Sequence, residues 1–218
     1  GQVYQDDNTN CSPDAGEFPM IQQWVNVQPE NYSIPTDDSG NYYYLIDTGM
    51  HTVDIKTLPD YYPGKCPTNG HMITLNATGG ASGLDFGYVP VANVTDLRLV
   101  ATPTRFRPGF IGRVHLNFAN IGTLSQNGTI SVELDSGMVA GVSSQMIASQ
   151  SGDTLVTWNY SGLDPTHTGG LWLEASLDTS VHLGDTLCII ANIFSAVGTD
   201  TTPTNNVDTL KVIVTGSY

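Results

Sequence analysis

The sequence predicts an all-β protein built from two β-sandwiches in tandem. Short runs rich in Val, Ile, Thr and Tyr recur along its 218 residues and are separated by 12 Pro and 23 Gly, a pattern typical of strands joined by turns. No stretch keeps the apolar period of an amphipathic helix. The length suits one large domain or two small ones. The short, proline-containing stretch Val89–Ala92 is the best boundary, and it divides the chain into domains of residues 1–90 and 91–218.

The first domain is expected to be a small sandwich of about seven short strands, because its apolar runs recur at the spacing that sandwiches show. The runs cover residues 3–4, 21–27, 31–36, 41–46, 51–56, 71–75 and 84–88. The turn Asp37-Asp38-Ser39-Gly40 joins two of these runs. A glycine-containing connection between two β runs is a hairpin signal.

The second domain is expected to be a sandwich of immunoglobulin type, again with about seven strands. Its runs cover residues 97–100, 112–118, 129–134, 155–158, 171–175, 187–193 and 207–214. Most of them alternate apolar with polar residues, as half-buried antiparallel strands do. The pattern therefore places one face of each strand in a core and the other in solvent.

The charge balance excludes some classes of partner. Seven Lys and Arg stand against 21 Asp and Glu, for a formal charge of −14. Such a chain repels phosphate backbones, so nucleic acid is not an expected partner, whereas divalent cations are attracted. No apolar run reaches the ~18 residues that a membrane span needs, and none resembles a signal peptide. Because the chain begins in what reads as a strand, we expect a processed or excised piece of a longer protein.

One loop near the N-terminus carries oxygen-bearing side chains at the spacing of a twelve-residue calcium loop. Counted from Asp6, they occupy positions one, three, five, seven, nine and twelve, the order in which such a loop presents its ligands. The residues are Asp6, Asn8, Asn10, Ser12, Asp14 and Glu17. Calcium suits this set because it is a hard cation that takes six to eight oxygens. The predicted cofactor is therefore calcium.

Two features of this loop depart from the usual pattern. Cys11 stands at the sixth position, where glycine is expected. The loop follows a predicted strand, and no amphipathic helix comes after it, so a helix–loop–helix arrangement is not predicted. The alternative is a polar turn without metal, since Asn, Asp and Ser dominate turns in any case.

The three cysteines predict one disulfide and one free thiol. Cys11 and Cys66 lie in loops of the first half, whereas Cys188 lies in an apolar run where a lone thiol acts as a small hydrophobe. We expect a Cys11–Cys66 bridge, which would contribute about 4 kcal/mol in the chain-entropy model and would indicate an oxidising, extracellular setting. The alternative is two reduced loop thiols.

The first ninety residues resemble the B-type and carboxypeptidase-regulatory-like repeats of bacterial surface proteins. The resemblance rests on the loop from Val3 to Glu17, on the later stretch from Thr36 to Tyr42, and on Leu84-Asp85-Phe86-Gly87, which is similar to a closing strand. It implies a prealbumin-like (Cna-B-like) sandwich in which such a loop binds calcium between strands. The Cys11 and Cys66 pair resembles a variant found in secreted proteins of the Bacteroidetes group.

The second half resembles an immunoglobulin-like domain that is repeated in the same surface proteins. The matching residues are Arg107-Pro108-Gly109, Phe118 to Gly122, and Asp200 with Pro203, Asn205 and Asn206 before the last strand. In that family the ending Gly216-Ser217-Tyr218 is typically followed by more chain. The resemblance implies a module of a longer secreted protein.

No catalytic constellation stands out, so we do not expect an enzyme. Asp47-Thr48-Gly49 and Asp135-Ser136-Gly137 resemble the paired signature of aspartic proteases, in which two carboxylates share a proton. The two tripeptides lie in different predicted domains, and both are ordinary turn sequences. The five histidines are scattered without zinc-ligand spacing.

The tyrosines offer a second candidate site. Tyr43 and Tyr62, each within a short run of tyrosines, could form an exposed platform that stacks on a sugar. Alternation would place Tyr42 and Tyr44 on one face of a strand and Tyr43 on the other. The alternative is that one face of this strand packs in the core and the other makes cross-strand pairs with a neighbouring strand.

Together these features predict a non-enzymatic extracellular module, a stalk or fibre subunit of an adhesive surface protein, stiffened by calcium and a disulfide. The expected partners are neighbouring domains or further copies of the chain, joined through edge strands. The alternative function is a carbohydrate-binding or adhesin module that contacts a glycan through Tyr43 and Tyr62.

Overall fold

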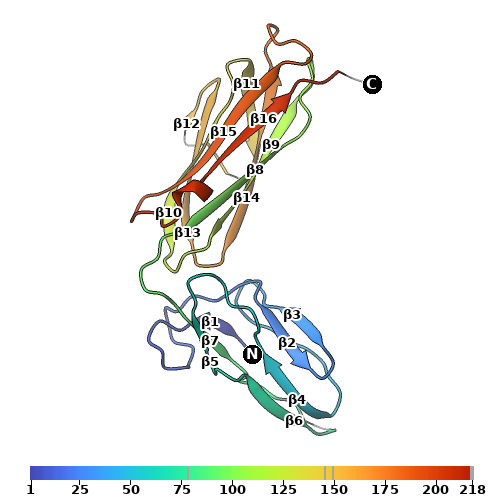
Figure 1. Ribbon diagram of the computed structural model, residues 1–218, viewed down its shortest axis with the longest axis vertical. Helices are drawn as coiled ribbons and strands as arrows, with labels where there is room; N and C mark the ends of the chain where they lie inside the picture. The colour runs from blue at the N-terminus through green and yellow to red at the C-terminus, as the bar shows by residue number, and fades with distance from the viewer. Residues whose placement is uncertain (78, 145, 149, 217–218) are drawn as a thin grey trace. The chain divides into compact units, whose positions relative to one another are not determined.

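A computed structural model describes residues 1–77, 79–144, 146–148 and 150–216. The described chain is all-β and holds no α-helix, only one short 3₁₀ turn, η1 (Pro203–Asn205). It forms two compact units, labelled by their strands in Figure 1: residues 1–94 with 165–167, and residues 95–164 with 168–218. The sequence placed the boundary at residue 90. In the part of the chain that the structure describes, no helix is long and apolar enough to cross a membrane.

The first unit contains a four-stranded antiparallel sheet and a three-stranded sheet. The larger sheet has the order β3 (Tyr32–Pro35), β2 (Trp24–Gln28), β4 (Gly49–Asp54) and β6 (His71–Leu75). The smaller sheet has the order β1 (Val3–Gln5), β7 (Phe86–Val89) and β5 (Gly64–Cys66). β1 and β7 are parallel, with Val3 opposite Phe86.

The core of this unit is made by apolar side chains from both sheets. It includes Val3, Met20, Val25, Val27, Val53, Ile55, Tyr62, Phe86 and Tyr88, all nearly or fully buried. Strand β2 shows why the sequence folds this way. Val25 and Val27 face inward, whereas Trp24, the first residue of the strand, is exposed. Alternation of apolar and polar residues places one face of a strand in the core.

Residues 41–46 were predicted to form a strand, and this prediction is wrong. Asn41 makes only an isolated bridge with Gln2, and Tyr42 exchanges hydrogen bonds with the backbone of Gly1 at 2.9 and 3.1 Å. Residues 43–46 pair with no strand in the described chain, so no ladder forms. Conversely, β5 was not predicted, because Gly-Lys-Cys has neither alternation nor β-branched residues.

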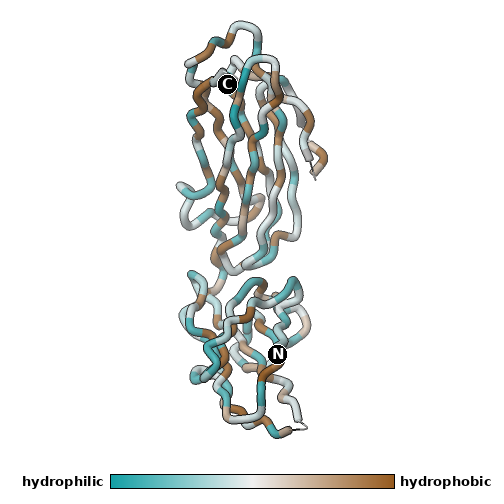
Figure 2. Tube along the Cα trace, turned by 90° about the vertical axis from the view of Figure 1, so that its right-hand side faces the viewer, coloured by the Kyte–Doolittle hydropathy of each residue, from teal (hydrophilic) through white to brown (hydrophobic). Residues whose placement is uncertain are grey.

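The second unit is a β-sandwich of two antiparallel sheets. One has the order β12 (Gln150–Ser151), β13 (Leu155–Leu163), β10 (Gln126–Glu133), β15 (Thr186–Ser195) and β16 (Val207–Ile213). The other has the order β11 (Met138–Ser144), β14 (Thr168–Leu177), β9 (Gly112–Asn120) and β8 (Leu97–Pro103). Apolar and polar residues are interleaved along these strands (Figure 2), and Trp158, Leu116 and Leu173 are among the fully buried residues between the sheets.

Candidate metal centre

The loop predicted to bind calcium leaves the end of β1 and is anchored to the smaller sheet. The backbone N–H of Asp6 donates to the carbonyl of Tyr88 in β7 at 2.8 Å, and Tyr4 makes a bridge with Pro19 where the loop returns. Both ends of the loop are therefore held by the sheet. The residues between them are mostly exposed, so their arrangement depends on contacts within the loop.

The Asp6 carboxylate organises the first half of the loop. Asp6 is fully buried, and its Oδ1 accepts a hydrogen bond from the backbone N–H of Asn10 at 3.1 Å while its Oδ2 accepts one from Cys11 at 3.0 Å. A buried carboxylate requires such partners, because desolvation of an unpaired charge is costly. Each carboxylate oxygen has two lone pairs, so each retains one for a cation.

Cys11 adopts the backbone conformation that glycine usually supplies at this position. Its φ is 63°, in the left-handed region that costs a residue with a Cβ about 1–2 kcal/mol. The residue is held there by the disulfide to Cys66, with the two Cα atoms 5.5 Å apart. The predicted bridge is confirmed, and Cys188 is the free cysteine, as expected. Because Cys66 belongs to β5, the cross-link ties the turn of the loop to the smaller sheet.

The Asp14 carboxylate lies opposite the amides of Asn8 and Asn10. Its Oδ2 accepts hydrogen bonds from Asn8 Nδ2 at 2.8 Å and from Asn10 Nδ2 at 2.6 Å. These two hydrogen bonds, that from Asn8 first, hold the pKa of the Asp14 carboxyl below its ordinary value. The amide N–H groups thus place partial positive charge beside the Asp14 carboxylate, where a bound cation would place a full charge.

The remaining ligand candidates close the loop. Both oxygens of Glu17 accept backbone hydrogen bonds, from Asp7 at 3.2 Å and from Asp14 at 2.9 Å. The backbone N–H of Ser12 donates to Asn10 Oδ1 at 2.8 Å. The structure therefore brings the predicted residues into one connected hydrogen-bond network.

The donor chemistry of this loop fits calcium, although its present geometry is that of a hydrogen-bonded turn. Carboxylate, amide and hydroxyl oxygens are the ligands that calcium takes. Among the described residues, no three His, Cys, Asp or Glu side chains converge as a metal cluster. Calcium binding by this set would therefore require the Asp6, Asp14 and Glu17 carboxylates to move closer together, with the side-chain oxygens of Asn8 and Asn10 turned toward the ion.

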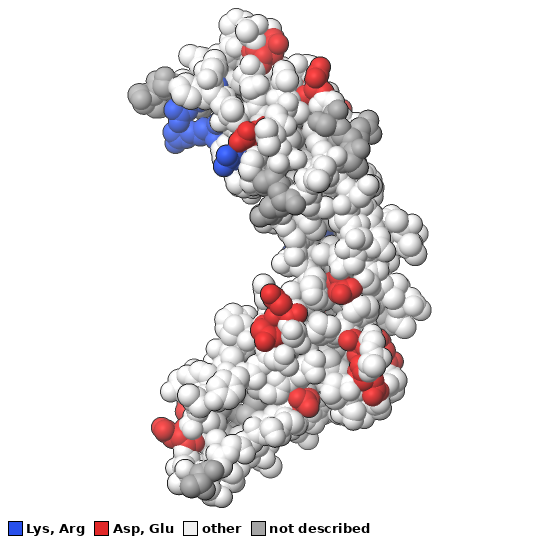
Figure 3. Space-filling model, turned by 180° about the vertical axis from the view of Figure 1, so that it is seen from behind, with Lys and Arg blue, Asp and Glu red and all other residues white. Residues whose placement is uncertain are grey.

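The electrostatic setting of the loop is acidic. Lys56 and Lys65 are the basic side chains within residues 1–94, and Figure 3 shows acidic side chains spread over one face of this unit. The field of such a surface raises the local concentration of divalent cations.

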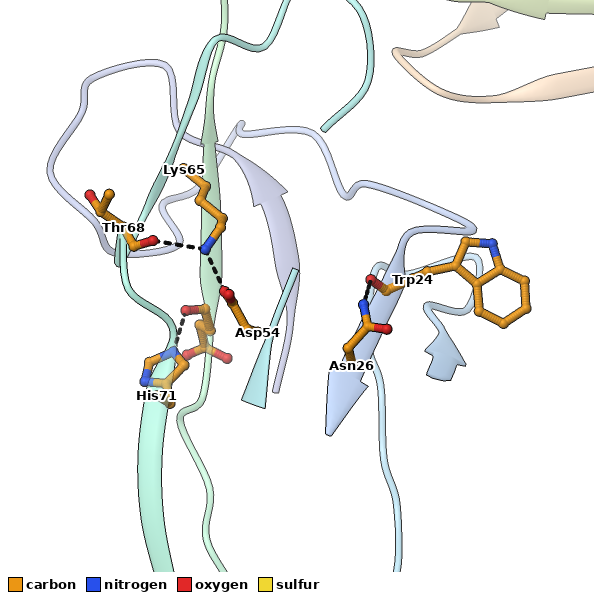
Figure 4. Close-up of polar contacts among 7 residues, drawn as sticks. Trp24, Asn26, Asp54, Lys65, Thr68 and His71 are labelled. Atoms are coloured by element: carbon orange, nitrogen blue, oxygen red, sulfur yellow. Dashed lines mark hydrogen bonds and ion pairs between the residues drawn. The ribbon is translucent and has the colours of Figure 1, made fainter. Parts of the chain in front are cut away.

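Sequence reasoning missed an ion pair that positions the cross-linked strand. Lys65, next to Cys66, contacts the Asp54 carboxylate of β4 and donates to the carbonyl of Thr68 at 3.0 Å (Figure 4). Its side chain is only 10% exposed, and its Nζ lies 5.7 Å from the centre of the Phe86 ring. The pair links the smaller sheet to the larger one. A lysine in a Gly/Pro-rich segment gives no signal of this burial.

The structure does not bring Tyr43 and Tyr62 together as an exposed platform, and this prediction is wrong for Tyr62. Tyr43 is 77% exposed, but Tyr62 is 3% exposed and its hydroxyl donates to Gln5 Oε1 at 2.5 Å. Burial raises the pKa of Tyr62 above its usual range. The ring of Tyr44 instead lies 4.8 Å from that of Tyr32.

The first protease-like tripeptide runs into β4, of which Gly49 is the first residue, and the second lies at the turn before β11. In the second, Asp135 accepts hydrogen bonds from the backbone N–H groups of Cys188 and Gly137, both at 3.0 Å. These bonds, that from Cys188 first, hold the pKa of Asp135 below its ordinary value. Its carboxylate is thus engaged in closing a turn.

No family model and no curated protein matches the sequence at a significant level. Several solved structures are similar in fold. The major pilin subunit BcpA of Bacillus cereus is 11% identical, with 98% of this chain and 67% of that chain covered and a TM-score of 0.43. The CARDB domain of the PF1109 protein of Pyrococcus furiosus, solved with di-metal ions, is 16% identical over 56% of this chain and 90% of that chain, with a TM-score of 0.42.

A third similar structure is the cohesin ScaC of Acetivibrio cellulolyticus, solved in complex with the ScaB dockerin. It is 11% identical over 54% of this chain and 99% of that chain, with a TM-score of 0.42. At these identities and scores, the likeness concerns the all-β fold and defines neither a family nor a function.

Proposed function

We propose that this chain is a non-enzymatic structural module of an extracellular surface protein, a stalk segment or fibre subunit, whose first unit is stiffened by calcium and by the Cys11–Cys66 disulfide. The observation that supports it best is the Asp6 carboxylate, which is buried and bonded to the N–H groups of Asn10 and Cys11. It keeps lone pairs for a cation at the first position of a twelve-residue ligand pattern.

The role of calcium in this proposal is mechanical. The outer part of the loop is held by hydrogen bonds among the exposed side chains and backbone of residues 8–14, which water can replace. Bound calcium would link Asp6, Asp14 and Glu17 through one ion and remove their mutual repulsion. Extracellular modules bind calcium with dissociation constants on the order of 0.1–1 mM, so the ion would act as a stiffener in calcium-rich surroundings.

The extracellular location is supported by the disulfide, because disulfides persist in oxidising environments. The partners proposed for the module are neighbouring domains of the same protein or further copies of the chain, through sheet edges. The burial of Tyr62 removes half of the tyrosine platform, so a glycan-binding role has less support than a structural one.

Calorimetric unfolding with and without calcium tests the proposal. At a concentration ten times the dissociation constant, binding to the folded state alone stabilises it by about 1.4 kcal/mol, which would raise the melting temperature of the first unit. Asp6→Asn should abolish this rise. Asp38→Asn, which removes an exposed acid outside the loop, should retain it. An equal rise in both variants would contradict a site in this loop.

A further inference from the structure

Strand β16 (Val207–Ile213) lies at one of the four sheet edges of the second unit, and the other three edges resist pairing with another chain. The sheet orders place β12, β8 and β11 at those three edges. β12 has two residues, and β11 changes register between Ala140 and Ser143. Short or irregular strands are poor templates for an added strand, so these two edges are protected by their geometry.

The edge of β8 is closed by side chains. The backbone N–H of Leu97 donates to Asp200 Oδ2 and that of Ala101 donates to Asp208 Oδ2, both at 2.8 Å. Pro103, two residues further along β8, has no N–H to offer. The donors that an added strand would need at these positions are therefore already used or missing.

The outer side of β16 remains open. Ile193 N–H donates to the carbonyl of Asn206, and Val214 N–H donates to that of Asp185, both at 2.9 Å. These bonds fix the phase of the antiparallel ladder, in which hydrogen-bonded pairs alternate with non-hydrogen-bonded ones. Residues 207, 209, 211 and 213 therefore direct their N–H and C=O groups away from β15. Within the part of the chain that the structure describes, no strand pairs with that outer side.

The same four residues carry the side chains that are exposed on this strand. Val207 and Ile213, at its two ends, are 44% and 61% exposed, and Thr209 and Lys211 lie between them. The open stretch ends beyond Ile213, because the N–H of Thr215 donates to the carbonyl of Phe106 at 3.1 Å. Strand β16 thus offers unpaired backbone groups together with two β-branched apolar side chains, which favour strand pairing.

This edge is complementary to itself in one register. When two copies of β16 run antiparallel with Leu210 opposite Leu210, Val207 lies opposite Ile213 and Thr209 lies opposite Lys211. Residues directly opposite each other place their side chains on the same face of the sheet, so two Val–Ile contacts form on the exposed face. All four outward-facing residues of each copy then gain backbone partners.

Neighbouring registers are less favourable. A two-fold axis at Lys211 would set two lysines directly opposite, and an axis at Thr209 would leave Ile213 outside the paired strands. With the axis at Leu210 the two lysines are diagonal neighbours about 7–8 Å apart. In water their repulsion is weak at that distance, and salt screens it further.

The match of Val207 with Ile213, at equal distances from Leu210, is a property of this strand with itself, and it singles out a second copy as the partner. Charge agrees with this choice. Residues 95–218 carry ten acidic and five basic side chains, so many contacts between two copies would bring acids together. The exposed residues of this edge include no acid, and its two-fold pairing avoids that repulsion.

We propose that β16 pairs antiparallel with β16 of a second copy, about a two-fold axis at Leu210, and joins the two five-stranded sheets into one. This inference deepens the proposed function, because it identifies the edge through which copies of the chain associate, and it does not depend on calcium. A single pair of strands is a small interface, so the dissociation constant should be on the order of 100 µM.

Sedimentation of the full chain from about 5 µM to about 1 mM spans the expected constant. The wild type should shift from monomer to dimer, and added salt should strengthen the dimer. Thr209→Pro removes an N–H that points away from β15, which an edge strand tolerates, and it should weaken the dimer at least tenfold. Thr209→Ala keeps that N–H and is the matched control. Ile213→Lys, at an exposed position, should also weaken the dimer tenfold or more.

Cross-linking tests the register in a Cys188→Ser background, which removes the free thiol. Thr209→Cys in one sample and Lys211→Cys in another should form disulfide-linked dimers under mild oxidation when the two samples are mixed. Opposite residues in a hydrogen-bonded pair lie about 5.5 Å apart, within the range of a disulfide. Neither variant should cross-link with itself, because residues in diagonal positions lie beyond about 7 Å.

The outcomes are decisive for the edge and separate from those for calcium. A chain that stays monomeric up to about 1 mM would overturn the proposal and would show that Lys211 protects this edge as well. A dimer that survives Thr209→Pro and Ile213→Lys would place the contact elsewhere. Self-cross-linking of either cysteine variant, or assembly beyond two copies, would overturn the two-fold register. A chelator should leave the dimer unchanged, so loss of calcium stabilisation alone leaves this proposal intact.

Discussion

The Asp6 carboxylate accepts a hydrogen bond from the backbone N–H of Cys11 at 3.0 Å, and Cys11 itself is cross-linked to Cys66. A buried charge and a disulfide thus act on the same residue, whose left-handed backbone makes the sharp turn of the loop. The turn that glycine usually permits in a calcium loop is here maintained by covalent and electrostatic constraint.

Removal of the disulfide should destabilise the first unit. Cys11→Ser with Cys66→Ser releases the constraint on a loop with a sequence separation of 55 residues, which should lower the free energy of unfolding by about 2–4 kcal/mol. Chemical denaturation followed by the fluorescence of Trp24 would measure it. Cys188→Ser, which removes the free thiol, should have a much smaller effect. Equal losses would argue against a stabilising cross-link.

The turn itself can be separated from the cross-link. In a Cys66→Ser background, Cys11→Gly should bind calcium more tightly than Cys11→Ala, because glycine adopts the left-handed conformation without the penalty of about 1 kcal/mol or more that a Cβ imposes. That difference corresponds to about a fivefold change in affinity. Calcium titration calorimetry would compare the two. Equal affinities would show that the conformation of residue 11 does not matter for binding.

Truncation of Tyr43 and of Tyr62, the two tyrosines of the predicted sugar-binding platform, should lower the free energy of unfolding by different amounts. Tyr62→Ala removes a buried ring that lies 5.9 Å from Tyr88 and a hydrogen bond to Gln5, so it should cost about 3–5 kcal/mol. Tyr43→Ala removes an exposed ring and should change the monomer by less than about 0.5 kcal/mol. Denaturation at low protein concentration would compare them. A large loss for Tyr43 would contradict its exposed position.

Asp135 should make the second unit sensitive to acid. Because its pKa is lower in the folded chain than its ordinary value of 3.8, it adds stability above that value. This contribution is lost as the pH falls from about 4 through the folded-state pKa. The Asp135→Asn side chain has one acceptor oxygen, which cannot accept from both Gly137 N–H and Cys188 N–H. The substitution should therefore lower the free energy of unfolding by about 1 kcal/mol at neutral pH.

Thermal unfolding from pH 7 down to about pH 2 would test this. The difference between the wild type and Asp135→Asn should shrink as the carboxyl becomes protonated. Asp153→Asn, at an exposed position in the connection between β12 and β13, serves as the control and should follow the wild type. A difference that stays constant with pH would rule out protonation of Asp135 as its source.

Local patterns were sufficient for the all-β class, for most strands and for the disulfide. They failed where long-range packing decides. Tyr62 lies among Pro and Gly and therefore looked exposed, but Gln5 and Tyr88 enclose it. Strand β11 was not predicted because its pairing with β14 changes register between Ala140 and Ser143, which breaks the alternation that marks a strand.

For the candidate site too, the sequence predicted the residues but not their contacts. Spacing alone identified the six oxygen-bearing residues of the loop, and the structure places them in one network. The spacing could not indicate that Asn8 and Asn10 turn their amide nitrogens toward Asp14. The spacing also could not indicate that Lys65 is buried against Asp54 and Phe86, because these contacts join residues that are distant in the sequence. The direction of the two amides depends on side-chain rotamers, which a sequence pattern does not encode.

The most direct test of the calcium loop is a calcium titration observed by NMR at the side-chain amides of Asn8 and Asn10. Ligation through their oxygens would polarise both side-chain amides, and with Asp14 as a further ligand it would change their hydrogen bonds to that carboxylate. Both amide signals should therefore shift together with a dissociation constant on the order of 0.1–1 mM, and Asp6→Asn should abolish the shift. Amide signals that stay unchanged up to about 10 mM calcium, well above that range, would contradict a calcium-stiffened module.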